Sequence, residues 1–304
     1  MQVLSKESDS LVLPAVVTVG KFDGFHAGHR TLLAVVLREM REDMVSCVLS
    51  ISEDENTAGK QLYTKKEQQY LCAGMGFDYL AEYTLDDAMK ALTPEEFVRD
   101  YLVTKLNAKT VVVGEDFYFG RGRSGDTEVL GKLGEKYGFR TVIVSLVESG
   151  GSRVSSTRIR ECLKKGQVEE ANFLLRRQFM IMGEIVHGNH LGETIGFPTI
   201  NIVPPAEKFL PPFGVYITKV RVEGMWYYGI TNVGLRPTVN SGTEGITVET
   251  HLLYCNRNLY GATAEVYFLS FLRNEKKFSD IKELSDALEQ DKAYAENYCK
   301  GLNI

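Results

Sequence analysis

Ala15-Val-Val-Thr-Val-Gly-Lys-Phe-Asp-Gly-Phe-His-Ala-Gly-His-Arg-Thr31 is the stretch that decides the fold of the first half of this chain. Its β-branched apolar run at 16–19 is typical of a buried strand, which ends at Gly20. A helix is predicted from Ala27 onward. A strand, a glycine-bearing turn and a helix N-terminus together make a phosphate site, because the unpaired N–H groups and the positive end of the helix dipole point at the same anion.

Two histidines, His26 and His29, stand three residues apart at the predicted helix start, so both can face one anion. An imidazole can donate a hydrogen bond to a phosphate oxygen, and its charge is adjustable near neutral pH. One alternative is a glycine turn that carries two surface histidines. A zinc site is the weaker alternative, because no cysteine or third histidine stands nearby at ligand spacing. The stretch therefore indicates phosphate chemistry.

Length and composition limit the classes of protein to which this chain can belong. The 304 residues suffice for two domains, each with its own core. The formal net charge of -5 argues against a general nucleic-acid binder. No apolar run approaches the ~20 residues of a membrane span, and the N-terminus lacks the pattern of a signal peptide. Five dispersed cysteines favour free thiols in the cytoplasm. We expect small-molecule partners, no nucleic acid and no membrane; an oligomer is possible but not indicated.

The first half alternates predicted strands and helices, which indicates a parallel sheet with helices on both faces. Capping boxes at Thr64 and Thr93 mark two helix starts, and Pro94 suits the first helical position. The strands are expected at 16–20, 44–51, 110–113 and 141–147, and the helices at 27–40, 65–74, 94–106 and 127–137.

Two later segments add polar and aromatic groups. The loop GEDFYFGRGRSGD, residues 114–126, follows a predicted strand, where α/β sheets bind ligands. Its aromatic faces suit a flat ring, and its arginines suit phosphate. The alternative is a basic surface loop with buried aromatics. The segment RVSSTRIR, residues 153–160, brings hydroxyls and arginines to a helix start, and its alternative is a Ser/Thr cap with exposed arginines.

Composition shifts near residue 166, and from about Phe179 the sequence is rich in short strands punctuated by glycine and proline. This pattern predicts a small antiparallel barrel with a C-terminal helix at 279–300. The overall fold class is α/β plus β, with domains at 1–178 and 179–304. The strands are expected at 180–187, 215–222, 225–231, 247–254 and 263–271.

The run G-x-F-D-G-x-H-x-G-H, followed in order by 114–126 and 153–160, resembles the nucleotidyltransferase half of the bacterial bifunctional riboflavin kinase/FAD synthetase family. The resemblance implies a Rossmann-like domain where the phosphate of FMN attacks the α-phosphorus of ATP, releasing pyrophosphate without a covalent enzyme intermediate. It implies catalytic roles for His26, His29 and Arg158. The implied ATP-binding residues are Gly20, Phe22, Asp23, Gly24, Ser155, Ser156 and Thr157, and the implied flavin-binding residues are Asp116, Phe117, Phe119 and Arg121.

The segment 183–201, which ends in GFPTIN, resembles the riboflavin kinase half of the same family, as do 213–216, 232–238 and 248–252 in order. No Walker P-loop is present, so a Walker-type kinase is excluded. Without the resemblance, a glycine-rich hairpin and a surface Glu249 are the alternatives. The implied roles are general base for Glu249, Mg²⁺ ligation for Thr199 and Asn201, flavin binding for Arg273, and ATP binding for Gly183, His187, Gly188, Gly196 and Pro198.

We therefore expect an enzyme that uses ATP and Mg²⁺ to convert riboflavin to FMN and FMN to FAD at two separate sites. Departures from the family pattern are an acidic stretch at 52–59, Glu193, Ile200 and the segment 254–258. These leave two alternatives open. Only the FMN adenylyltransferase half is active, or the chain is a flavin-binding regulatory protein without turnover.

Overall fold

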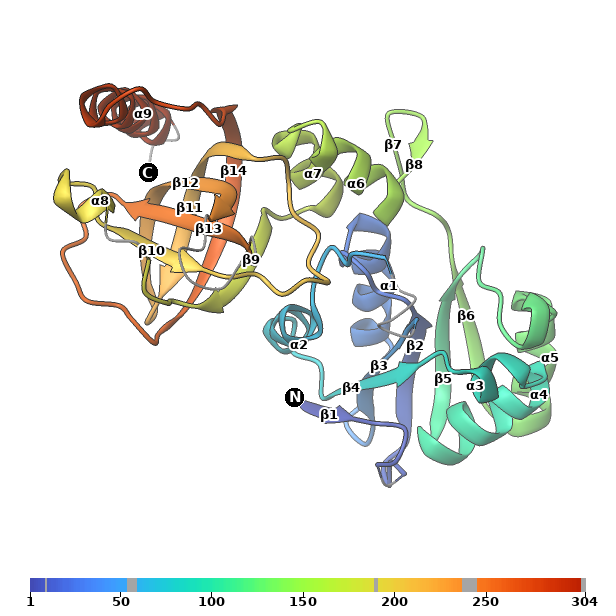
Figure 1. Cartoon of the computed structure of the whole chain (residues 1–304). Coiled ribbons are helices and arrows are strands. Elements are labelled where there is room, and N and C mark those ends of the chain that lie inside the picture. Colours follow the sequence, from blue (N-terminus) through green and yellow to red (C-terminus); the bar gives the residue numbers. More distant parts are fainter. Residues whose placement is uncertain (9, 54–58, 189–190, 237–244, 302–304) are drawn as a thin grey trace. The chain divides into compact units, whose positions relative to one another are not determined.

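The computed structural model describes the whole chain except residues 9, 54–58, 189–190, 237–244 and 302–304. The chain divides into two compact units, Met1–Ser156 and Thr157–Ile304, each described by itself (Figure 1). Most of the acidic stretch at 52–59 and the side chain of Glu193 lie outside the described residues.

A six-stranded parallel sheet forms the first unit, with the strand order β1-β4-β3-β2-β5-β6. It confirms the predicted parallel sheet. Two of its strands, β1 and β4, were not predicted. The strands are β1 (Gln2–Leu4), β2 (Ala15–Gly20), β3 (Val45–Ser52), β4 (Tyr79–Thr84), β5 (Ala108–Gly114) and β6 (Arg140–Val144).

Helices cover both faces of this sheet, α1 and α2 on one and α4 and α5 on the other (Figure 1), as right-handed crossovers on either side of β2 require. Short strands β7 (Glu148–Ser149) and β8 (Ser152–Arg153) pair as a hairpin. The helices are α1 (Ala27–Arg38), α2 (Lys65–Gly74), α3 (Asp87–Ala91), α4 (Pro94–Phe97), the π-helix η1 (Val98–Lys105), the 3₁₀ turn η2 (Arg121–Arg123) and α5 (Thr127–Tyr137).

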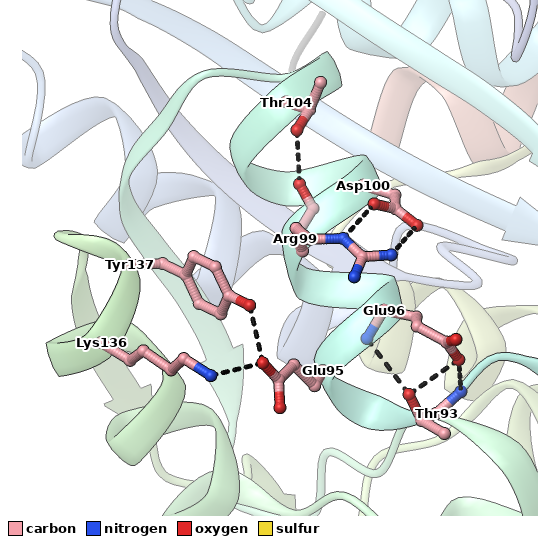
Figure 2. A network of polar contacts seen from close by, with 8 residues as sticks. All are labelled: Thr93, Glu95, Glu96, Arg99, Asp100, Thr104, Lys136 and Tyr137. Carbon is pink, nitrogen blue, oxygen red and sulfur yellow. Dashed lines mark hydrogen bonds and ion pairs between the residues drawn. The ribbon is translucent and has the colours of Figure 1, made fainter.

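Both predicted capping boxes are present, at Thr64 and Thr93. The helix expected over 94–106 is α-helical only through Phe97 and continues as a π-helix. The Thr104 hydroxyl donates to the Arg99 carbonyl five residues earlier at 2.8 Å, which matches the wider turn. Figure 2 shows this bond. It also shows the Tyr137 hydroxyl of α5, which donates to the Glu95 carboxylate of α4 at 2.8 Å.

The strand order reverses at β2. The chain runs from β2 to β3 and β4 on one side, then returns to place β5 on the other. The carboxyl ends of β2 and β5, at Gly20 and Gly114, therefore flank a topological switch point. Open α/β sheets bind their ligands there.

The second unit is built on a six-stranded antiparallel sheet of order β10-β13-β12-β11-β14-β9. A bridge between Val186 and Asn201, with the Val186 N–H donating to the Asn201 carbonyl at 2.8 Å, links the two edges. The predicted barrel is confirmed, and β10 is an addition to the predicted strands. The strands are β9 (Phe179–Glu184), β10 (Thr199–Ile202), β11 (Gly214–Val222), β12 (Met225–Arg236), β13 (Gly245–Leu252) and β14 (Thr263–Asn274).

Helix α9 (Ile281–Gly301) packs on this sheet, as predicted for the C-terminal segment. Its Ala295 is fully buried against Val215, Ile217 and Ile230. Among the described residues, no helix is both long and apolar enough to cross a bilayer. The remaining helices are α6 (Ser156–Lys164), which begins at the boundary of the units, α7 (Val168–Leu175) and α8 (Leu191–Thr194).

Candidate active sites

A cavity of about 750 Å³ opens at the switch point of the first unit. It has a polar end at the turn after β2 and an apolar end at the loop after β5. Those two surfaces suit a phosphate chain and a flat ring respectively. Of the residues implicated by sequence, the cavity is lined by Gly20, Phe22, His26, His29, Asp116, Phe117 and Phe119.

The turn after β2 is held in an unusual backbone conformation. Phe22 and Phe25 have φ of +44° and +45°, and both side chains are fully buried. Non-glycine residues rarely adopt this region, so buried packing must maintain it. Asp23 also holds the turn: its carbonyl accepts from the Ser156 hydroxyl at 2.5 Å, and its carboxylate accepts from the Leu62 N–H at 2.8 Å. Asp23 and Ser156 are thus placed behind the cavity wall.

His26 and His29 come together as predicted. Their rings stack with centroids 3.7 Å apart. His26 caps α1, because its Nδ1 accepts from the His29 N–H at 3.3 Å, so the neutral ring carries its proton on Nε2. Burial, reinforced by the charge of Arg153, lowers the pKa of His26 to about 4. Burial also lowers the pKa of His29 well below its ordinary value. Both rings are therefore neutral donors at pH 7.

Arg153 lines the cavity, and the site residues implied by the sequence did not include it. Its guanidinium forms an ion pair with the carboxylate of Asp116. Arg153 belongs to β8, far along the chain from the histidines, and it lines the same cavity. Spacing within one motif does not reveal this proximity. Asp116 therefore has a partner of opposite charge, and Arg153 is one of the cationic side chains that line the cavity.

The aromatic loop after β5 is fastened to the start of α4. Phe117 and Phe119 stack with centroids 5.3 Å apart, and Phe97 packs on Phe119 at 5.8 Å. The Arg121 N–H donates to the Leu92 carbonyl at 2.6 Å. The Arg121 side chain is exposed and outside the cavity lining, where Arg123 stands instead.

The remaining polar residues of this motif set lie at the junction of the units. Ser155 and Ser156 end the first unit, and Thr157 and Arg158 begin the second. In the second unit the Arg158 guanidinium donates to Glu170 at 3.2 Å. Gly24 sits inside the turn with φ of +95° and does not line the cavity. The roles of these residues stay predictions.

Two cavities of the second unit share Thr199. The glycine-side cavity, about 550 Å³, is lined by Gly188, Pro198 and Asn201 among others. The glutamate-side cavity, about 490 Å³, is lined by Glu249 and Arg273 and by Leu284 and Leu288 of α9. Thr199 therefore stands where two ligands can meet, one from each side.

Asn201 and Glu249 are cross-strand partners in β10 and β13. Asn201 is 2% exposed, and its Oδ1 is buried without a hydrogen-bond partner among the described residues. Such an orphaned oxygen is costly unless a cation or water satisfies it. Its Nδ2 donates to the Thr199 hydroxyl oxygen at 3.4 Å, so the side-chain amide and the hydroxyl are neighbours. The donor set fits Mg²⁺, which prefers hard oxygen ligands.

The structure also shows the neighbours or the backbone conformation of four other residues predicted for the kinase half. His187 is exposed and stacks on Tyr260 with centroids 3.8 Å apart. Gly183 packs against Ile202, where a side chain has no room. Gly196 has φ of +83°.

Arg273 lines the glutamate-side cavity, yet its guanidinium is bidentate to Asp291 of α9, at 2.9 and 2.7 Å. Sequence spacing did not reveal that pairing.

The segment that departs from the family pattern at 254–258 contributes to the glycine-side cavity. Cys255, Asn256, Arg257 and Asn258 line it together with Ile200. Arg257 forms an ion pair with Glu223 at 2.5 Å. The wall of this cavity therefore includes neutral polar groups and an arginine that is paired with a carboxylate.

The comparisons with known proteins agree with both halves. Residues 9–158 match the FAD synthetase family, and residues 175–299 match the riboflavin kinase family. The bifunctional riboflavin kinase/FMN adenylyltransferase of Escherichia coli K12 is 36% identical over 93% of this chain and 92% of its own length. The Bacillus subtilis 168 protein of the same name is 31% identical over 95% and 93%.

Among solved structures, a protein described as a macrolide-efflux protein from Streptococcus pneumoniae has a TM-score of 0.84 and 29% identity. The match covers 97% of this chain and 99% of that one. These similarities extend over both units, and they bear out the resemblance inferred from the motifs. The chain belongs to the bifunctional riboflavin kinase/FMN adenylyltransferase family.

Proposed function

We propose that this chain phosphorylates riboflavin to FMN and adenylylates FMN to FAD, with ATP as the donor at two separate sites. The observation that carries the proposal is the pairing of two differently built sites in one chain. One cavity joins stacked neutral histidines to stacked phenylalanines, and the other site joins an orphaned amide oxygen to a cross-strand carboxylate.

In the first unit the residues orient substrates and offset charge, and none forms a covalent bond. The Nε2–H of His26 can donate to a phosphate oxygen, and Arg153 supplies fixed positive charge nearby. Preorganised donors of this kind typically contribute ~10² to 10³ in rate each. The FMN phosphate attacks the α-phosphorus of ATP while the O–P bond to pyrophosphate breaks. Phe117 and Phe119 border the flavin.

In the second unit Glu249 accepts the proton of the riboflavin 5′-hydroxyl as its oxygen attacks the γ-phosphorus and ADP leaves. Thr199 and Asn201 would hold Mg²⁺, which offsets phosphate charge when bound. We assign ATP to the glycine-side cavity and the flavin to the glutamate-side cavity, since Glu249 lines the latter and Thr199 lines both. We also propose a cytoplasmic location, which the five free thiols support.

One incubation tests the proposal. The purified protein receives riboflavin, ATP and Mg²⁺, and the flavins are separated by chromatography. Accumulation of both FMN and FAD is expected. FAD formed only when FMN is supplied would leave a single active half, and bound flavin without product would mean a regulatory protein.

A further inference from the structure

His251 is a residue of the kinase site to which no role has yet been given. It lies on β13 two residues after Glu249, so both side chains are on the same face of the strand. In the sheet it pairs with Thr199 of β10. Its ring contacts Phe197 with centroids 5.1 Å apart and lines the glutamate-side cavity. His251 is therefore next to the segment that carries the proposed metal ligands.

The contact that matters is between His251 Nδ1 and the carbonyl oxygen of Pro198, 2.9 Å apart. A carbonyl can only accept, so Nδ1 must carry the proton and donate. The neutral ring that makes this bond is the Nδ1–H tautomer, and its Nε2 is left as an acceptor.

This hydrogen bond restrains the segment that leads into β10. The chain enters β10 through Gly196, at φ of +83°, and proline has no N–H to donate. Phe197 is held by its N–H, which donates to the Gly192 carbonyl at 2.8 Å. The Pro198 carbonyl belongs to the peptide that leads into Thr199, and the His251 bond fixes its direction.

We infer that His251 is a positioning residue of the kinase site: its Nδ1–H holds the Pro198–Thr199 peptide so that the Thr199 hydroxyl faces the cavities beside the side-chain amide of Asn201. The inference rests on the proposed function. It adds the claim that the donor at Nδ1, and not the ring as such, prepares the site for a magnesium nucleotide.

Two substitutions distinguish a role for the Nδ1 donor from a role for the ring as a whole. In His251→Asn the side-chain amide can stand near the place of Nδ1, whereas in His251→Gln it stands near the place of Nε2. We expect His251→Gln to weaken Mg·ADP binding, measured by calorimetry, about tenfold, the worth of one hydrogen bond. His251→Asn should stay within about threefold of the unsubstituted protein. FMN adenylylation should be unchanged in both variants.

Equal weakening in the two variants, or none in either, would overturn the inference. A direct measurement on the unsubstituted protein does not depend on how the variants fold. Long-range ¹H–¹⁵N spectra of the histidine rings should show His251 protonated at Nδ1, and protonation at Nε2 would contradict it. If the unsubstituted protein neither binds Mg·ADP nor phosphorylates riboflavin, the proposed kinase function is overturned as well. Protonation at Nε2 alone would overturn only the role of His251.

Discussion

His26 and His29 stack on each other at the start of α1, where the charge of Arg153 reinforces the effect of burial on both pKa values. A buried imidazole beside a guanidinium resists protonation because burial removes the solvent that would stabilise the cation and the guanidinium repels it. The same arrangement makes room for an anion. A bound polyphosphate would supply the negative charge that the site lacks, and the neutral rings would donate to it.

This environment predicts how stability depends on pH. Burial lowers the pKa of His26 from its ordinary 6.5 to about 4 in the folded chain, so between these values the unfolded chain binds the proton more tightly. Stability is therefore full above pH 6.5 and falls as pH drops toward 4, by up to about 3 kcal/mol. Urea unfolding of the first unit, followed by circular dichroism at pH 7 and 5, measures this loss.

A matched variant and an internal control accompany that measurement. His26→Gln removes the titrating group, so its unfolding should depend less on pH than that of the unsubstituted chain. Trp226 is the only tryptophan of the sequence and lies in the second unit. Its fluorescence should show a smaller shift between the two pH values. An identical pH dependence in His26→Gln would show that His26 is not the group responsible.

At the scale of elements, the loop after β5 depends on a close approach to α4. A Cβ built at Gly125 would lie 2.8 Å from the Phe119 ring and 3.0 Å from Pro94. We expect Gly125→Ala to displace Phe119 and to raise the KM for FMN about tenfold or more in the adenylyltransferase assay, with a small effect on riboflavin phosphorylation. Gly131→Ala in α5 is the control, since a Cβ there meets open space and alanine favours helix by about 1 kcal/mol. Equal KM values in the two variants would contradict this account of the loop.

Helix α9 is joined to the barrel by an ion pair with a buried carboxylate. Asp291 is 5% exposed and takes both ends of the Arg273 guanidinium. Asp291→Asn should destabilise the second unit by about 2 kcal/mol, less than a fully buried pair because Arg273 is partly exposed, and should raise the KM for riboflavin. Trp226 fluorescence in urea measures the stability. Glu161→Gln breaks the exposed Lys164–Glu161 pair and should change little; a similar change in both variants would mean that α9 is held by packing alone.

Local patterns predicted most of the elements. The β-branched run of β2 and the capping box of α2 are complete signals within a few residues, and both elements were predicted. Strands β1 and β10 have three and four residues, too few for a periodicity to show. The π-helix begins after an ordinary α-helical start, and the Thr104 bond that accompanies it leaves no periodic pattern in the sequence.

The site residues, too, could be predicted where they belong to a local motif and not where they depend on tertiary contacts. The histidines, the phenylalanines and Asn201 belong to contiguous motifs, and the structure brings each set to a cavity. Arg153 beside Asp116, Asp291 on Arg273, and His251 on Pro198 join residues from separate elements. Tertiary packing creates these pairs, so spacing along the chain could not reveal them.

The chain consists of two units whose sites share no residue among those described. The first site is built at the switch point of a parallel sheet, and the second is built on the adjacent strands β10 and β13 of an antiparallel barrel. If each unit completes its own chemistry, a change confined to one site should leave the other reaction at its full rate.

The most direct test of this account is a paired assay of His29→Ala and Glu249→Gln. Riboflavin phosphorylation and FMN adenylylation are measured separately for each variant, with the substrate of each step supplied. We expect His29→Ala to lose adenylylation by ~10²-fold or more while it keeps phosphorylation, and Glu249→Gln to show the reverse. Comparable loss of both reactions in either variant would contradict two independent sites.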